Sequence, residues 1–285
     1  MLNFIINRAA GNYTSKKVFA SVKTYLNKNK IGFRVFYSLN REQIKEIVGR
    51  LEADKEDNLI VVGGDGTVHD VVNALTIPSK IKLGIIPAGK DNNFALSLGL
   101  SLKPLEALNT ILLGNTIKQD LISAGGIYAV NSVLVSGDYY LKPRKQKLGQ
   151  NEAFNINLLK ILKSARSFSL LSSIDGLKPS EKEVNAVMLA NGKTNLNGLE
   201  LVSSADNSDG KIEYVEFVKG ALKLKFKNKA LVLGEDEELK ITPVKSVKIT
   251  SGEDDKFDML IDGEFVKDVL GEFLVVKGAL MVFKN

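Results

Sequence analysis

Residues 59–75 read LIVVGGDGTVHDVVNAL. The first four form a continuous apolar run, which is typical of a strand buried on both faces of a parallel sheet. The valines that follow recur at helical spacing, so the segment GGDGT is expected to join a strand to a helix. Its spacing matches neither the dinucleotide fingerprint nor the Walker pattern.

The composition of this turn favours a phosphate ligand. Glycines let the backbone approach a ligand closely, and the start of a helix offers free amide groups and a positive dipole. A carboxylate in the middle of the turn can contact a metal or a ribose hydroxyl, and a threonine adds a hydroxyl donor. The candidate residues are Gly63, Gly64, Asp65, Gly66 and Thr67. A purely structural turn is the alternative.

Strand and helix signals alternate on both sides of the turn. Apolar strand patterns occupy residues 4–6, 33–37 and 83–86, and helical spacing occupies residues 18–26 and 44–51. This alternation predicts a doubly wound α/β domain with a mostly parallel sheet.

A second loop, PAGKDNNFA at residues 87–95, leaves the next predicted strand. Ligands of open α/β sheets bind at the carboxyl ends of the strands, so we expect both loops to face one crevice. The candidate binding residues of this loop are Gly89, Lys90, Asn92 and Asn93. For the two asparagines, helix capping is the alternative.

After about residue 121 the pattern changes to short alternating runs separated by turn residues, which predicts an antiparallel β-sandwich or barrel. We therefore expect an α/β domain over residues 1–122 and a β-sandwich domain over residues 123–272. The segment 273–285 is expected to return to the first domain. One helical insert is predicted at residues 154–166.

The composition excludes several chemistries. The 285 residues include no cysteine and one histidine, His69, so a disulfide, a cysteine nucleophile and a multi-histidine zinc site are excluded. A Ser-His-Asp relay remains formally open. The net charge of +6 fits a polyanionic partner or a simple solubility surface. The first residues lack a signal-peptide pattern and no apolar run reaches about 18 residues, so we expect a cytoplasmic protein.

Further motifs occur in a fixed order along nearly the whole chain. They are Ile6-Asn7-Arg8-Ala9-Ala10-Gly11, the two loops above, Asp120-Leu121, Asn131 with Gly137-Asp138, Ala205-Asp206-Asn207-Ser208-Asp209-Gly210 and Ile261-Asp262-Gly263-Glu264. Together they resemble the diacylglycerol kinase catalytic-domain family, which includes bacterial diacylglycerol kinases, sphingosine kinases and ceramide kinases.

The resemblance implies an ATP-dependent lipid kinase that phosphorylates the hydroxyl of diacylglycerol or a related lipid alcohol. It implies an N-terminal nucleotide-binding domain and a C-terminal lipid-substrate domain. Asn7 and the turn from Gly64 to Thr67 would contact ATP, and Glu264 would be the general base. Phosphoryl transfer depends on positioning and charge neutralisation more than on a covalent nucleophile, so a chain without cysteine can perform it.

The resemblance also implies magnesium. Asp65 and Asp138 would belong to the magnesium and phosphate network, and Asp209 would hold a structural Mg²⁺ together with the backbone carbonyls of Asp206 and Lys211. Oxygen ligands of this kind suit Mg²⁺. Without the resemblance, the Asp209-Gly210 and Asp262-Gly263 segments would be interpreted as ordinary turns.

Two departures from the family pattern leave alternatives open. Lys90 stands where the family has threonine, and Asn93 stands where it has aspartate. An amide lacks the charge that binds Mg²⁺ or accepts a proton, so a catalytically weakened nucleotide or lipid sensor is one alternative. Independently of these departures, NAD kinase is an alternative, because it shares GGDGT on a similar α/β domain. The segments around Asn93 and Glu264 favour the lipid branch.

We expect ATP and a lipid at a membrane surface as partners, with peripheral association at the inner membrane face. The basic segments 142–147 and 219–229 are candidate membrane-facing patches. The helix 154–166 could also lie on the bilayer, and packing into the core is its alternative. The sequence has no basic platform interleaved with aromatic residues, so nucleic acid is not expected as a partner. A homodimer is one possible oligomeric state.

Overall fold

The computed structural model describes residues 1–7, 14–136, 166–193, 195–196, 199–200, 202–218, 224–227, 230–233 and 240–284. The chain divides into an N-terminal unit, Met1–Leu121 with Lys277–Asn285, and a C-terminal unit, Ile122–Val276. Two strands pass from one unit to the other, β5 (Thr116–Ala124) and β20 (Glu272–Phe283). Asp138, the basic segment 142–147 and all of the predicted helix 154–166 except Arg166 lie outside the described residues, as does most of 219–229.

The N-terminal unit is a parallel sheet with helices on both faces. Its sheet strands are β1 (Leu2–Asn7), β2 (Phe33–Ser38), β3 (Asn58–Gly63) and β4 (Lys82–Pro87), and its helices are α1 (Thr14–Lys28), α2 (Arg41–Ala53), α3 (Asp65–Ala74), η2 (Pro78–Lys80), α4 (Asn93–Ser97) and α5 (Pro104–Leu113). The strand order is β2-β1-β3-β4, followed by the end of β20, which pairs in parallel with β4. This confirms the predicted doubly wound α/β domain.

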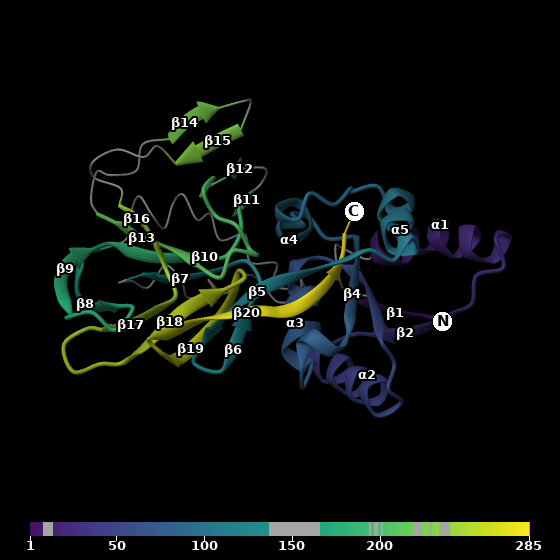
Figure 1. Cartoon of the computed structure of the whole chain (residues 1–285), viewed down its shortest axis with the longest axis horizontal. Coiled ribbons are helices and arrows are strands. Elements are labelled where there is room, and N and C mark those ends of the chain that lie inside the picture. The colour runs from purple at the N-terminus through teal and green to yellow at the C-terminus, as the bar shows by residue number, and fades with distance from the viewer. Residues whose placement is uncertain are drawn as a thin grey trace, which may run out of the picture. The chain divides into compact units, whose positions relative to one another are not determined.

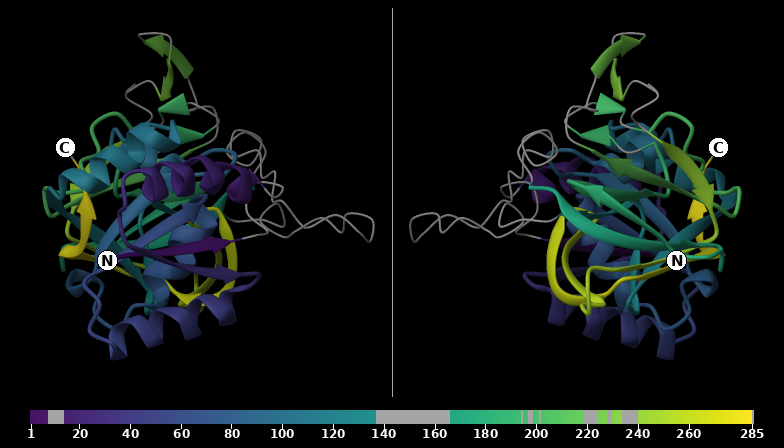
Figure 2. Two further views of the ribbon diagram at one scale, coloured as in Figure 1. Left: turned by 90° about the vertical axis from the view of Figure 1, so that its right-hand side faces the viewer. Right: turned by 90° about the vertical axis from the view of Figure 1, so that its left-hand side faces the viewer.

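Two pairs of helices cover the two faces of this sheet. Helices α1 and α5 lie on one face, and α2 and α3 lie on the other (Figures 1 and 2). The first pair shares a core with the sheet that includes Phe4, Phe19, Leu26, Leu108 and Ile111. The apolar spacing of each helix therefore buries one face, as amphipathic periodicity requires.

Helix α2 shows how the sequence sets a helix boundary. The side chain of Asn40 accepts a hydrogen bond from the backbone N–H of Gln43 at 3.0 Å, and Gln43 Oε1 accepts one from the backbone N–H of Leu39 at 2.8 Å. These bonds satisfy backbone donors around the helix start, as in a capping box.

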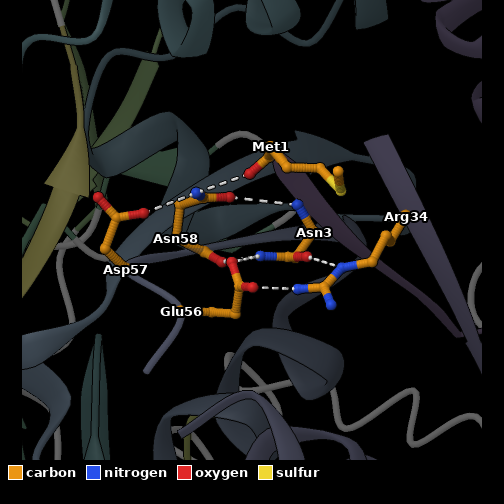
Figure 3. A network of polar contacts seen from close by, with 6 residues as sticks. All are labelled: Met1, Asn3, Arg34, Glu56, Asp57 and Asn58. Carbon is orange, nitrogen blue, oxygen red and sulfur yellow. Dashed lines mark hydrogen bonds and ion pairs between the residues drawn. The ribbon is translucent and has the colours of Figure 1, made fainter. Parts of the chain in front are cut away.

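A polar network fixes the amino ends of three strands (Figure 3). Asn3, which is fully buried, donates its backbone N–H to Asn58 Oδ1 at 3.1 Å and its side-chain amide to Glu56 Oε2 at 3.0 Å. Arg34 donates to Asn3 Oδ1 at 2.8 Å and forms an ion pair with Glu56 at 2.5 Å. The hydrogen bond from Asn3, followed by the charge of Arg34, holds the pKa of Glu56 below its ordinary value. The network ties β1, β2 and the loop before β3 together at the end opposite the glycine-rich turn.

The C-terminal unit is an antiparallel β-sandwich. One sheet has the order β16-β13-β10-β7-β18-β19, and the other contains β9, β8, β17, the start of β20 and the β5–β6 hairpin. Their bounds are β6 (Ile127–Ala129), β7 (Ser132–Ser136), β8 (Phe168–Ile174), β9 (Ser180–Val184), β10 (Ala186–Ala190), β13 (Ile212–Phe217), β16 (Ile241–Val244), β17 (Ser246–Thr250), β18 (Lys256–Ile261) and β19 (Glu264–Leu270). Two small hairpins, β11 (Asn195–Leu196) with β12 (Leu199–Glu200) and β14 (Leu224–Lys227) with β15 (Ala230–Leu233), accompany them.

Side chains from both sheets form one core. Leu170, Ile249 and Phe273 come from one sheet, and Val187 and Met259 come from the other. A core packed between two sheets identifies a sandwich, so the predicted fold class of this half is also confirmed. Within the described residues, no helix combines the length and the apolar character needed to cross a bilayer.

Candidate active site

The two predicted ligand loops lie together at the carboxyl ends of β3 and β4. Gly63 is paired with Pro87, and the backbone N–H of Ala88 donates to the carbonyl of Gly63 at 2.9 Å. Beyond this point the loops touch through their backbones, because a Cβ added to Gly89 would lie only 2.4 Å from the Cα of Gly64. Both positions therefore require glycine for close approach, and the loops form one surface.

Asp65 fastens the second loop to the first. It is the first residue of α3, and its two carboxylate oxygens accept the backbone N–H groups of Asn93 and Phe94, each at 2.9 Å. These are the first amides of α4, so Asp65 caps a helix that begins 28 residues later in the sequence. A carboxylate at a helix start is stabilised by these amides and by the helix dipole.

The capping alternative for the asparagines is therefore wrong for Asn92. It precedes α4 in a left-handed conformation with φ of 53° and makes no side-chain capping bond. Its side chain instead accepts from the backbone N–H of Gly89 at 2.9 Å and donates to the carbonyl of Gly89 at 3.0 Å. Asn92 thus braces the second loop. Asn93 begins α4, and Lys90 is exposed in the same loop.

The end of β1 joins the same assembly. Asn7 donates its side-chain amide to the hydroxyl of Thr67 at 3.2 Å, and Ser15 donates its hydroxyl to the carbonyl of Asn7 at 2.6 Å. Thr14, the first residue of α1, donates to the carbonyl of Ala88 at 2.9 Å. Thr67 is buried, so its hydroxyl holds the turn in shape. The structure thus brings together every predicted nucleotide-binding residue of the N-terminal unit.

The start of α3 is arranged for an anion. Its N-cap residue is Gly64, which forms no side-chain capping bond among the described residues. The first amides of a helix lack the usual partner four residues back, and they carry the positive end of the dipole. In α3 the amide of Thr67 donates to the carbonyl of Gly64 at 3.0 Å. A phosphate group can bind at a helix start of this kind.

In the C-terminal unit, Asp262 anchors the turn that precedes Glu264. Its carboxylate accepts the backbone N–H groups of Val130, Asn131 and Ser132 at 2.9, 2.8 and 3.1 Å. Asp262 and Gly263 both have positive φ, 52° and 86°, as a two-residue hairpin turn requires. Glu264 is half-buried and begins β19 directly after this fixed turn.

Asn191, which the sequence patterns do not single out, holds the same segment from its other side. Its side-chain amide donates to the carbonyl of Val130 at 2.9 Å, and its backbone N–H donates to the carbonyl of Asn131 at 2.8 Å. Together with Asp262, it leaves little freedom to residues 130–132. A single asparagine after a buried strand carries no sequence signal for this role.

The segment from Asp206 to Lys211 forms tight turns. Asp206 Oδ1 accepts from the backbone N–H of Ser208 at 3.0 Å and from its hydroxyl at 2.6 Å, and Asp209 Oδ1 accepts from the backbone N–H of Lys211 at 2.8 Å. Nearby, Glu213 is only 4% exposed. Burial first, and then the carboxylates of Asp209 and Asp206, raise the pKa of Glu213 to about 7.

The chemistry of this segment fits Mg²⁺ in kind, because carboxylate and carbonyl oxygens are the donors that the ion prefers. In the part of the chain that is described, no three acidic, histidine or cysteine side chains gather around one point. Mg²⁺ at Asp209 would therefore depend on backbone carbonyls and water for most of its ligands.

Comparison with known proteins identifies the family. The family model described as "Diacylglycerol kinase catalytic domain" matches residues 1–124. The diacylglycerol kinase of Bacillus subtilis (strain 168) is 30% identical over 233 residues, which cover 76% of this chain and 74% of that protein. The chain belongs to the diacylglycerol kinase family. Membership confirms the resemblance expected from the ordered motifs.

Other relatives agree with this family at shorter or more distant range. The protein YtlR of Bacillus subtilis (strain 168) is 36% identical over 111 residues, but this match spans only 38% of this chain and 35% of that relative. A crystal structure of a diacylglycerol kinase from Bacillus anthracis str. Sterne is similar over 100% of this chain and 96% of that chain, with a TM-score of 0.80 and 23% identity. An NAD kinase from Archaeoglobus fulgidus, crystallised with ATP, has a TM-score of 0.54 and 13% identity over 100% of this chain and 94% of that chain. These two structures share the fold.

Proposed function

We propose that the protein transfers the γ-phosphoryl group of ATP to the hydroxyl of diacylglycerol or a related lipid alcohol. Membership of the diacylglycerol kinase family supports a phosphotransferase. The observation that carries the proposal is the pair of loops pressed together at Gly64 and Gly89 and fastened by Asp65, next to the uncapped start of α3. Phosphoryl transfer depends on such fixed positioning and on charge neutralisation.

Each residue then has a defined task. The amides at the start of α3 bind phosphate oxygens, and Asp65 keeps α4 and the second loop in place. Glu264 accepts the proton of the lipid hydroxyl, so that the hydroxyl oxygen forms the new bond to phosphorus while the bond to ADP breaks. Lys90, exposed in the second loop, contributes positive charge near the phosphates. The products are ADP and a phosphorylated lipid.

Mg²⁺ supplies charge neutralisation when bound. Asp209 and the carbonyls of Asp206 and Lys211 are its proposed structural ligands, with Asp65 and Asp138 proposed for the network toward the phosphates. Asp138 lies outside the described residues. We further propose that the protein acts in the cytoplasm at the inner membrane face, where its lipid substrate lies.

The test is direct transfer of label. Purified protein receives ATP labelled in the γ-phosphate, magnesium, and mixed micelles that contain diacylglycerol, sphingosine or phosphatidylglycerol; a parallel tube receives NAD instead. Label in a lipid is expected, and it should fall by about 100-fold or more in Glu264→Gln, since a positioned general base contributes about that much. Glu253→Gln, an exposed glutamate of the same unit, is the matched control. Label in NAD rather than in a lipid would contradict the proposal.

The sensor alternative rests on Asn93, an amide where the family pattern has a carboxylate. If the protein binds ATP without transferring label, the Asn93→Asp variant tests whether the amide is the cause. A rise in turnover in this variant would show that the Asn93 amide accounts for the lost activity, and unchanged turnover would rule that explanation out.

A further inference from the structure

The positive charge of this protein is concentrated at one end of the chain. Residues 1–41 contain eight lysines and arginines and no aspartate or glutamate. The whole chain has 39 basic and 33 acidic residues, so residues 42–285 carry a net charge of −2. The excess of positive charge therefore belongs entirely to the first 41 residues, most of which form β1, α1 and β2.

Helix α1 carries four of these eight basic residues and presents them to solvent. Lys16, Lys17, Lys23 and Lys28 are all exposed, and no acidic residue lies on the helix. None of the ion pairs found among the described residues involves these four lysines. The helix thus presents unneutralised positive charge along its length of about 20 Å.

Helix α5 beside it presents leucines. It covers the same face of the sheet as α1, and the two helices share one core (Figure 1). Yet Leu105, Leu112 and Leu113, with Leu102 just before the helix, are 41%, 37%, 63% and 46% exposed. The spacing of Leu105, Leu112 and Leu113 places them on one side of the helix. The one acidic side chain of α5, Glu106, is paired with Lys103 at 2.8 Å.

We propose that the outer faces of α1 and α5, here called the α1–α5 face, bind the surface of an anionic lipid bilayer. Lysines attract anionic headgroups, and leucines beside them can enter the boundary between headgroups and acyl chains. Charge complementarity selects a bilayer over a second copy of this chain, because two copies would bring their lysines together. A nucleic acid would leave the exposed leucines without a contact. The inference rests on the proposed function, because a lipid kinase must meet its substrate at a bilayer.

The geometry of α1 connects this face to the candidate active site. At the start of α1, Thr14 donates to the carbonyl of Ala88 in the second ligand loop, and Ser15 donates to the carbonyl of Asn7 at the end of β1. Docking through α1 would therefore hold the phosphate-binding loops at a fixed distance from the headgroups.

Vesicle sedimentation tests the inference without requiring catalysis. The protein is mixed with vesicles of phosphatidylcholine alone or with an equal share of phosphatidylglycerol, at low and high salt. We expect binding only to the anionic vesicles, weakened by salt. The Lys23→Gln/Lys28→Gln variant should bind about thirtyfold more weakly, since each lysine near an anionic surface contributes about a fivefold factor. The Leu105→Gln/Leu112→Gln variant should bind about tenfold more weakly, through lost apolar burial.

Matched controls use exposed residues outside the α1–α5 face. Lys45→Gln/Lys80→Gln removes two lysines on α2 and η2, and Leu39→Gln removes a leucine that is 57% exposed. Both should bind like the original protein. Three results would each overturn the inference. The lysine variant binds vesicles as well as the original protein does, the original protein binds no vesicles, or sedimentation equilibrium shows a dimer that the leucine substitutions dissociate.

The same variants separate this inference from the proposed function. Turnover of a short-chain diacylglycerol dissolved as monomers should be unchanged in Lys23→Gln/Lys28→Gln, whereas turnover of diacylglycerol embedded in anionic vesicles should fall. If the protein phosphorylates the dissolved lipid but does not bind vesicles, only the inference about the α1–α5 face is overturned. If it binds vesicles but phosphorylates no lipid, only the proposed function is overturned.

Discussion

The contact between Gly64 and Gly89 offers the sharpest perturbation of the candidate active site. An alanine at position 89 would place its Cβ 2.4 Å from the Cα of Gly64 and 2.9 Å from Asn92 Oδ1. Ordinary contact begins near 3.4 Å, so the two loops must separate by about 1 Å. The neighbour at 2.4 Å is a backbone atom, so no side-chain rotation can relieve the overlap.

Two effects of different size should follow in Gly89→Ala. Overpacking at a rigid contact costs about 1–3 kcal/mol of unfolding free energy, which leaves the protein folded in the absence of urea. A displacement of about 1 Å in a catalytic arrangement can lower the rate by about 100-fold. We therefore expect kcat/KM for ATP to fall by about two orders of magnitude, with a modest shift in the urea midpoint.

Gly49→Ala is the matched control. Gly49 lies within α2, and an added Cβ there meets nothing within 4 Å. Alanine in a helix is favoured over glycine, so this variant should keep full activity and gain about 0.5–1 kcal/mol. Calorimetric titration with ATP, kinase turnover and urea unfolding are measured on both variants. If Gly89→Ala kept the original ATP affinity and turnover, close backbone contact would not shape the proposed nucleotide site.

Four further changes test other parts of the account. Asp65→Asn leaves the first amides of α4 with at most one acceptor, so it should lower the free energy of unfolding by about 2–3 kcal/mol and weaken ATP binding. An unchanged ATP affinity in calorimetry would contradict the role of Asp65 in fastening the second loop to the first. Asp262→Asn lacks the charge that three backbone amides share and should cost about 2–4 kcal/mol in urea unfolding, whereas a loss under about 0.5 kcal/mol would contradict the anchoring role. The pKa of Glu56 is lowered in the folded protein, so its stabilisation is present above its ordinary value of 4.5 and is lost as the pH falls below it. The difference in urea midpoint between the original protein and Glu56→Gln should accordingly close below that pH, and a constant difference would contradict the assignment. Finally, Mg²⁺ should raise the melting temperature of the original protein but not that of Asp209→Asn; equal shifts would remove Asp209 from the proposed site.

The strand and helix positions around the glycine-rich turn follow from local sequence. The continuous apolar run ending at Val62 predicts a buried strand, the helical spacing of the valines after Thr67 predicts a helix, and both elements form. The two-residue turn at Asp262-Gly263 is equally local, since these residue types tolerate positive φ. Features fixed within a few residues are therefore readable from the sequence.

The polar contacts that build the site are not local. Asp65 caps a helix 28 residues away, and Asp262 binds amides 130 to 132 residues away. No spacing rule relates such partners, because the fold alone brings them together. The local capping rule even favours Asn92, but its left-handed backbone turns its side chain toward Gly89.

Glu213 shows a second limit of pattern reasoning. The alternation at residues 212–218 indicates a strand, which the structure has as β13. A glutamate on a strand is ordinarily expected to face solvent. Here both faces of β13 are buried, so the carboxyl group of Glu213 is desolvated and its pKa rises to about 7.

The central claim is that the phosphoryl group of ATP ends on a lipid hydroxyl. Mass spectrometry of diacylglycerol recovered after incubation with the protein, ATP and Mg²⁺ tests it most directly. We expect a lipid product heavier by one phosphate group, formed by the original protein and the Gly49→Ala control but nearly absent with Glu264→Gln. Unchanged diacylglycerol together with phosphorylated NAD in the parallel reaction would contradict it.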